Sequence, residues 1–398
     1  MRWLFALAVF LMSGISAHPD QNTPDAARVL AQPYAQFGFE VLCDLAAEHP
    51  NTNAFISPTS IAVALAMTAN GAEGATRDAI LSVLHTSGDS TAAFNAANRA
   101  LADEISKTAA VQLSIANALW VQQGIPVEPA FQQILQSEYG AQAENVDFRT
   151  PVAANTINAW VADHTNDRIK KLVENIDPAT ITMLTNAIAF KGQWSAQFDA
   201  KETQPHDFTT AAGHTRKVPM MKHYGQYNYA SANGLESIRL PYADGSFAMY
   251  VVLPQDQARM RVFLEQLTTE NFTSLISSLQ SSKGTIELPR FTLEYSATLN
   301  SVLIKLGMGA AFGSSANFRA INQSRPLQIS EVRHASFLRV DEEGTEAAAA
   351  TSVGIRAAVA RIGPPPFHMI VDHAFFIAIR DERNGQLLFT GLIANPES

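Results

Sequence analysis

The chain has 398 residues, of which 47% are hydrophobic and 16% charged, a composition typical of a globular protein with a sizeable core. Its net charge of −9 argues against a general nucleic-acid binder, because such proteins need a basic face to displace counterions from phosphates. The single cysteine, Cys43, excludes an intramolecular disulfide, and side-chain packing must therefore stabilise the fold.

The N-terminal residues have the pattern of a signal peptide. Arg2 supplies a positive charge, residues 3–12 form an apolar run, and small residues follow before a polar stretch. This run is too short to span a bilayer, and no later segment of 18 or more apolar residues appears in the sequence. We predict cleavage after Ala17 and a single domain over residues 18–398. The expected location is secreted, which means extracellular, or periplasmic in a bacterium.

Helical patterns dominate the first half of the sequence. One helix is expected over residues 25–48. A second is expected to begin where Ser57 can act as N-cap and Pro58 suits the first helical position, and Gly71 can end it. Residues 155–174 carry apolar side chains at helical spacing, which predicts an amphipathic helix.

The second half of the sequence is richer in strands. Residues 243–245 and Asn384-Gly385 each lie between two apolar runs, which is typical of a β-hairpin. Residues 284–296 alternate apolar and polar side chains. Because helices and strands do not alternate strictly, we predict one α+β domain with mostly antiparallel or mixed sheets.

Sequence signatures of catalysis are absent. The chain has no G-x-S-x-G, H-E-x-x-H, P-loop or C-x-x-C motif, and its ten histidines show no spacing typical of metal ligands. We therefore expect no enzyme activity, no catalytic residues, no metal and no cofactor. The alternative is a hydrolase whose catalytic triad is assembled only in space.

One segment, DEEGTEAAAATSVGIRAAVARIGPPP over residues 341–366, does not fit a well-packed domain. Its alanines allow a surface helix, and its small residues allow a linker or a slack loop. A strand is a fourth possibility, because every odd position from Thr345 to Ala357 is small or apolar and uncharged. Both charged residues of that stretch, Glu346 and Arg356, occupy even positions. The segment can therefore enter a sheet with its odd side chains buried.

This segment resembles the hinge of the serpins, the serine protease inhibitor family. The matching residues are Glu342, Glu343, Gly344, Thr345, Glu346, Ala347, Ala348, Ala349, Ala350 and Thr351. The resemblance spans nearly the whole mature chain, and further matching stretches are residues 53–61, 65–67, 71–76, 186–194 with Phe198, 218–221, 288–291, 306–308, 311–312, 389–391 and 395–396.

The resemblance implies the serpin fold, with three β-sheets, about nine helices and an exposed reactive-centre loop over about residues 344–366. It also implies a suicide-substrate mechanism, in which a target serine protease cleaves the loop and is trapped as an acyl-enzyme when the loop inserts into the central sheet. The expected partner is that protease, bound covalently to a monomer, with no nucleic acid or membrane. The helix expected around residues 93–107 mixes both charge signs, and we see no heparin site there.

The resemblance also indicates which residues control insertion. The "shutter", where strands must part, corresponds to Ser57, Ser60, Asn186 and His334. The "breach", where insertion begins, corresponds to Trp194 with the Gly344–Thr345 hinge. The alternative interpretation of the four shutter residues is an ordinary set of hydrogen-bonded polar groups in a core.

Counting from Glu342 in the family's usual way places the scissile bond at Ala358-Val359. A small residue before the cut suits elastase-like or subtilisin-like proteases with shallow pockets. One alternative is inhibition of a trypsin-like protease at Arg361-Ile362, and another is a non-inhibitory serpin that acts as carrier or chaperone.

Overall fold

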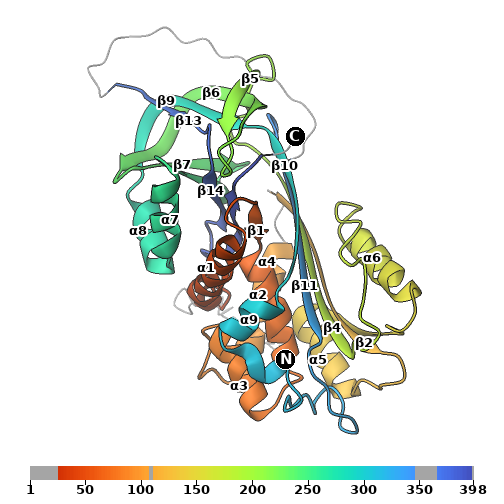
Figure 1. Cartoon of the computed structure of the whole chain (residues 1–398). Helices are drawn as coiled ribbons and strands as arrows, with labels where there is room; N and C mark the ends of the chain where they lie inside the picture. The colour runs from red at the N-terminus through yellow and green to blue at the C-terminus, as the bar shows by residue number, and fades with distance from the viewer. Residues whose placement is uncertain (1–25, 107–110, 346–364, 397–398) are drawn as a thin grey trace, which may run out of the picture.

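The computed structural model describes residues 26–106, 111–345 and 365–396 (Figure 1). The predicted signal peptide and most of the predicted reactive-centre loop lie outside the described residues. The helices are α1 Ala31–Glu48, α2 Pro58–Ala69, α3 Gly74–Val83, α4 Thr91–Ser106, α5 Pro129–Tyr139, α6 Val152–His164, α7 Gln257–Glu265, α8 Thr269–Ser277 and α9 Asn300–Lys305, with two 3-10 turns, η1 Arg28–Leu30 and η2 Met308–Ala311.

The strands come mostly from the second half of the chain. They are β1 Ala54–Ile56, β2 Val111–Gln122, β3 Gln142–Val146, β4 Thr182–Gln193, β5 Gln204–Thr209, β6 Thr215–Ala232, β7 Leu235–Tyr242, β8 Phe247–Pro254, β9 Gln280–Pro289, β10 Phe291–Thr298, β11 Glu331–Val340, β12 Gly344–Thr345, β13 Phe367–Ile370, β14 Phe375–Asp381 and β15 Leu387–Ile393. The α+β class with mixed sheets is thereby confirmed.

The described strands form two hydrogen-bonded sheets. The central sheet has the order β10-β11-β4-β2-β3, with β12 added to β4. The other sheet has nine strands in the order β1-β15-β14-β8-β7-β6-β9-β13, with β5 added to β6. The three expected sheets are thus joined into two, because β6 is 18 residues long and pairs with β5 near its start and β7 near its end.

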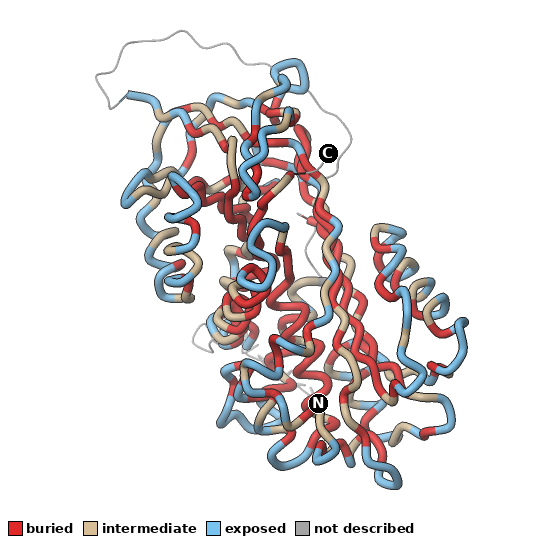
Figure 2. The backbone as a smooth tube through the Cα atoms, viewed as in Figure 1, coloured by how far each residue is buried: buried red, intermediate tan, exposed pale blue. Residues whose placement is uncertain are grey.

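The main core lies between the sheets, around α1 and α2 (Figures 1 and 2). As the sequence predicts, the Ser57 side chain caps α2 by accepting a hydrogen bond from the Ser60 backbone N–H at 3.2 Å, and Pro58 occupies the first turn. Gly38 lets α1 approach this turn, since a Cβ there would lie 2.3 Å from Pro58. Cys43 is half-buried on the outer part of α1, and burial raises the pKa of its thiol to about 11.

The predicted helix over residues 155–174 is shorter than expected. It begins at Val152 and ends at His164, because Asn166 and Asp167 take left-handed φ angles of 51° and 60°. The apolar side chains after the turn still pack on the central sheet without being helical. The two predicted hairpins are confirmed, since β7 pairs with β8 and β14 with β15 across tight turns.

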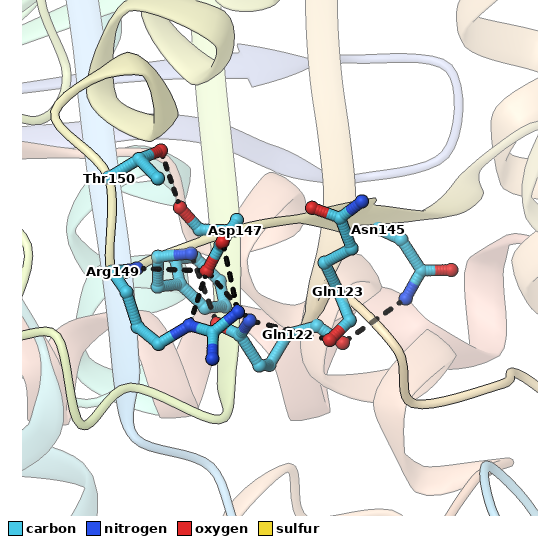
Figure 3. Close-up of polar contacts among 7 residues, drawn as sticks. Gln122, Gln123, Asn145, Asp147, Arg149 and Thr150 are labelled. Atoms are coloured by element: carbon cyan, nitrogen blue, oxygen red, sulfur yellow. Dashed lines mark hydrogen bonds and ion pairs between the residues drawn. The ribbon is translucent and has the colours of Figure 1, made fainter.

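A polar turn holds the start of α6 at the edge of the central sheet (Figure 3). The Asp147 carboxylate accepts hydrogen bonds from Arg149 Nε at 2.7 Å and from Gln122 Nε2 at 2.9 Å. These donors hold the pKa of Asp147 well below its usual range. The turn therefore fixes where the chain leaves β3 and begins the helix that covers the sheet.

Within the described residues, no helix combines the length and apolar character that a membrane crossing requires.

Candidate functional site: the seam of the central sheet

The central sheet has a seam between β11 and β4. These strands pair in parallel from Glu331 opposite Met183 to Leu338 opposite Phe190. If these two strands part, a strand that enters between them can form hydrogen bonds with the freed edges of both. The predicted hinge begins beside this parallel pair, at β12.

The chain that leaves β11 already enters the upper end of this seam. It reverses in a tight turn in which the backbone N–H of Asp341 donates to the Gly344 carbonyl at 2.8 Å. The two residues of β12 then pair antiparallel with β4, with Gly344 opposite Gln193 and Thr345 opposite Gly192. Since β2 occupies the other edge of β4, β12 lies on the β11 side. Its continuation in the same direction would run between β11 and β4.

Gly344 is required by this geometry. Its φ of +147° lies in a region that favours glycine, and a Cβ there would meet the Gly192 carbonyl oxygen at 2.2 Å. We expect Gly344→Ala to lower the free energy of unfolding by about 2 kcal/mol and to displace β12 from β4. Urea unfolding followed by tryptophan fluorescence measures the first effect. Amide exchange at Thr345 measures the second, and unchanged protection of that amide would contradict the assigned role.

Trp194, a residue of the predicted breach, contacts the turn that leads into the predicted hinge. Trp194 Nε1 donates to the Asp341 carbonyl at 2.9 Å, and its backbone N–H donates to the Glu343 carbonyl at 3.1 Å. The indole is buried and stacks on Tyr242 with ring centroids 4.4 Å apart. This tryptophan therefore holds the turn between β11 and β12.

Two carboxylates complete the breach. Glu342 Oε1 accepts from Thr203 Oγ1 at 2.7 Å and lies 3.4 Å from Arg290 Nη1. Asp341, which the sequence did not single out, has Oδ1 accepting from the backbone N–H groups of Glu343 and Gly344 at 3.2 Å each. Burial raises the pKa of Asp341. An aspartate at the first position of a turn with glycine at the fourth is a recognised turn signal that could have identified it.

The four predicted shutter residues form one buried hydrogen-bond network. His334 Nδ1 lies 2.6 Å from Asn186 Oδ1, and His334 Nε2 lies 3.3 Å from the backbone nitrogen of Ser57. Asn186 Nδ2 donates to Ser60 Oγ at 2.5 Å. The main-chain N–H of Ser57 can only donate, which makes Nε2 the acceptor and places the imidazole proton on Nδ1. The histidine is neutral here, and burial lowers its pKa to about 3.

This network crosses the seam. His334 on β11 and Asn186 on β4 are direct register partners, and so are Asn186 and Asn117 on β2. Asn186 Nδ2 also donates to Asn117 Oδ1 at 2.5 Å, a contact that the sequence did not predict. Parting β11 from β4 would break the His334–Asn186 hydrogen bond.

The comparisons with known proteins decide the family. The family model described as "Serpin (serine protease inhibitor)" matches residues 32–396. The chain belongs to the serpin family. It is 35% identical over 91% of its length to an uncharacterized serpin-like protein of Thermococcus kodakarensis, covering 84% of that protein. It is 32% identical over 92% of its length to neuroserpin of Gallus gallus, covering 91% of that protein.

Solved serpin structures have the same fold. The structure matches human thyroxine-binding globulin in complex with thyroxine with a TM-score of 0.86 at 25% identity, covering 94% of this chain and 100% of that one. It also matches the native state of the thermophilic serpin tengpin with a TM-score of 0.83 at 29% identity, covering 92% and 93%.

The segment in which we predict the reactive-centre loop begins after β12, which pairs with β4 of the central sheet. It ends before β13, which pairs in parallel with β9 at the edge of the nine-stranded sheet. Phe367, the first residue of β13, stacks on Tyr229 with centroids 4.1 Å apart. The hinge residues 346–351 and both candidate reactive bonds, Ala358-Val359 and Arg361-Ile362, lie outside the described residues.

Helix α6 lies on the face of the central sheet opposite to α1 and α2 (Figure 1). Its buried side chains Ile157 and Val161 belong to one apolar cluster with Ala187 of β4 and Ala335 of β11. A strand added between β4 and β11 would move these two alanines apart beneath the helix. A strand added at this seam would therefore require α6 to adjust.

The predicted absence of a heparin site concerns α4. Arg99 on this helix pairs with Glu138 of α5 at 3.1 Å.

In the described part of the chain, no three or more His, Cys, Asp and Glu side chains are grouped so that they could hold a metal ion.

Proposed function

We propose that this serpin is a secreted suicide-substrate inhibitor of serine proteases. The observation that carries the proposal is β12, which begins the insertion path beside β4, followed in the sequence by a hinge without a bulky or charged residue on its odd side. A hinge with bulky or charged residues, which could not be buried in the sheet, would instead indicate a non-inhibitory serpin. The likeness to neuroserpin and the match to the serine protease inhibitor family support an inhibitor.

The proposed mechanism starts with the protease treating the loop as substrate. Its nucleophilic oxygen attacks the Ala358 carbonyl carbon, the Ala358–Val359 amide bond breaks, and the amine of Val359 takes up the proton. An ester then joins the protease to Ala358. Cleavage releases the hinge to continue β12 along β4. Roughly ten new backbone hydrogen bonds, each worth about 1 kcal/mol net, favour this insertion together with apolar burial.

Insertion stops the protease before the ester is hydrolysed. The attached enzyme travels with Ala358, and distortion of its catalytic groups by about 1 Å costs on the order of a hundredfold in rate. The uncleaved state persists because the His334–Asn186 contact and the apolar cluster under α6 hold the seam closed. Inhibition is thus driven by a fold that is kinetically trapped.

The proposed targets are elastase-like or subtilisin-like proteases, because Ala358 suits a shallow pocket. The test incubates the protein with pancreatic elastase, subtilisin and trypsin, followed by denaturing gel electrophoresis and mass spectrometry. A boiling-resistant band at the summed mass and a released peptide that starts at Val359 are expected with elastase or subtilisin. A peptide that starts at Ile362, with trypsin trapped, would instead move the bond to Arg361.

A carrier role is the second candidate, favoured by the likeness to thyroxine-binding globulin. It predicts that the loop is cleaved without a covalent complex and without a gain in thermal stability. Observation of those two results with all three proteases would replace the inhibitor proposal.

A further inference from the structure

Residues of α7, α8 and the β6–β7 hairpin line a surface cavity of about 440 Å³. These elements lie far from the seam between β11 and β4 (Figure 1). The volume of the cavity falls in the range typical of small-molecule sites. The apolar side chains that line it are Leu235, Val262, Phe263, Leu267, Phe272 and Leu275. Phe272 and Leu267 are buried, and Phe272 makes an edge contact with Phe39 at 5.5 Å. The floor of this cavity is therefore anchored in the core.

One cation lies at the rim of this cavity. Arg259, in the first turn of α7, lies across the β6–β7 turn, where Gly234 has a φ of +74°. A Cβ on that glycine would come within 3.0 Å of Arg259 Nε, and the glycine therefore makes room for the guanidinium side chain. Asp256 Oδ1 is engaged as the N-cap of α7 and accepts from the Arg259 backbone N–H at 2.8 Å.

The Arg259 guanidinium has no carboxylate partner among the described residues. Glu236 and Glu265, the carboxylates next along β7 and α7, have other partners, since Glu236 accepts from the Tyr229 hydroxyl and Glu265 lies 3.9 Å from Arg261. An unpaired guanidinium beside an apolar wall matches a ligand with a carboxylate at one end, because guanidinium and carboxylate form paired hydrogen bonds.

We propose that this cavity binds a medium-chain or aryl monocarboxylate, with the apolar body on the Phe263–Phe272 floor and the carboxylate at Arg259. A second cavity of about 310 Å³ lies on the other side of α8 and is lined by two arginines, Arg28 and Arg380. Arg380 already pairs with Glu382 at 3.2 Å. We place the ligand in the first cavity because it is larger and because more apolar side chains line it.

Isothermal titration of the full chain with decanoate tests the proposal, and 1-decanol serves as the neutral probe. We expect a dissociation constant on the order of 100 µM for decanoate and binding of decanol that is at least tenfold weaker. Arg259→Gln should weaken decanoate binding about tenfold and leave decanol binding unchanged. Arg261→Gln is the matched control, since Arg261 lies on the same helix and does not line the cavity.

Tryptophan substitutions in the two cavities locate the ligand. Ala230→Trp places an indole in the cavity and should abolish decanoate binding, and Ala232→Trp at the rim serves if the first variant does not fold. The proposal is overturned if decanoate and decanol bind equally, if Arg259→Gln binds as the wild type does, or if decanoate does not bind. Loss of binding on Gln32→Trp, which fills the second cavity, with full binding to Ala230→Trp would also overturn it.

Discussion

Replacement of Ala349 by arginine is expected to turn the protein from an inhibitor into a substrate. If the hinge extends β12 along β4, the odd positions after Thr345 face the buried side of the sheet. A guanidinium without a partner there costs several kcal/mol, which slows insertion. We expect the yield of the covalent elastase complex to fall at least tenfold while the loop is still cleaved. Gel densitometry at several enzyme ratios measures both products.

Ala350→Arg is the matched control for this prediction. It introduces the same charge one position later, on the even side that carries Glu346 and Arg356. The expected complex yield is close to that of the wild type. Equal losses in the two variants would show that charge alone interferes, and would contradict insertion with the predicted side-chain alternation.

The neutral state of His334 is expected to make the closed seam sensitive to acid. Burial lowers its pKa to about 3, and the unfolded chain has a value near 6.5. Below pH 6.5 the unfolded state binds a proton that the folded state does not, so stability falls as the pH falls towards 3. Above pH 6.5 the full stability is present. Between pH 7.5 and 5.5 the expected loss from this residue is about 1.4 kcal/mol.

Urea unfolding at several pH values measures this loss, and His334→Gln isolates it. A glutamine amide can donate to Asn186 and accept from Ser57 and has no proton to gain in this range. The variant should be less stable at pH 7.5 and should lose about 1.4 kcal/mol less than the wild type on acidification. His164→Gln, at an exposed position on α6, should keep the wild-type slope. An unchanged slope in His334→Gln would refute the role of His334.

Much of the site could be predicted from the sequence because its residues occur in continuous motifs. Ser57 and Ser60 lie in one recognisable stretch of sequence, and Gly344 lies in another. Asn117 lies in no such stretch, and its place beside Asn186 depends on the register of β2 against β4. A shift of one residue would turn its side chain to the other face of the sheet.

The fold shows a similar limit. Turn residues and alternation predicted the hairpins correctly, since those signals are local. The helix over residues 155–174 was predicted too long, because the apolar side chains after residue 164 keep packing on the sheet after the backbone has left the helix. The junction of two sheets through β6 depends on which partners pair along that strand, and that choice is made by tertiary packing.

The pairing of β1 with β15 joins the two ends of the domain, and it sets when the protein can finish folding. Asn53, just before β1, accepts hydrogen bonds from the backbone N–H groups of Ala394 and Asn395 at 2.8 and 2.9 Å. Ribosomes need tens of seconds to make the residues between these partners. During that time the nascent chain exposes the apolar surfaces of α1 and α2 that β15 will cover. Native structure is therefore completed after translation, and an abortively shortened chain lacks the strand that closes it.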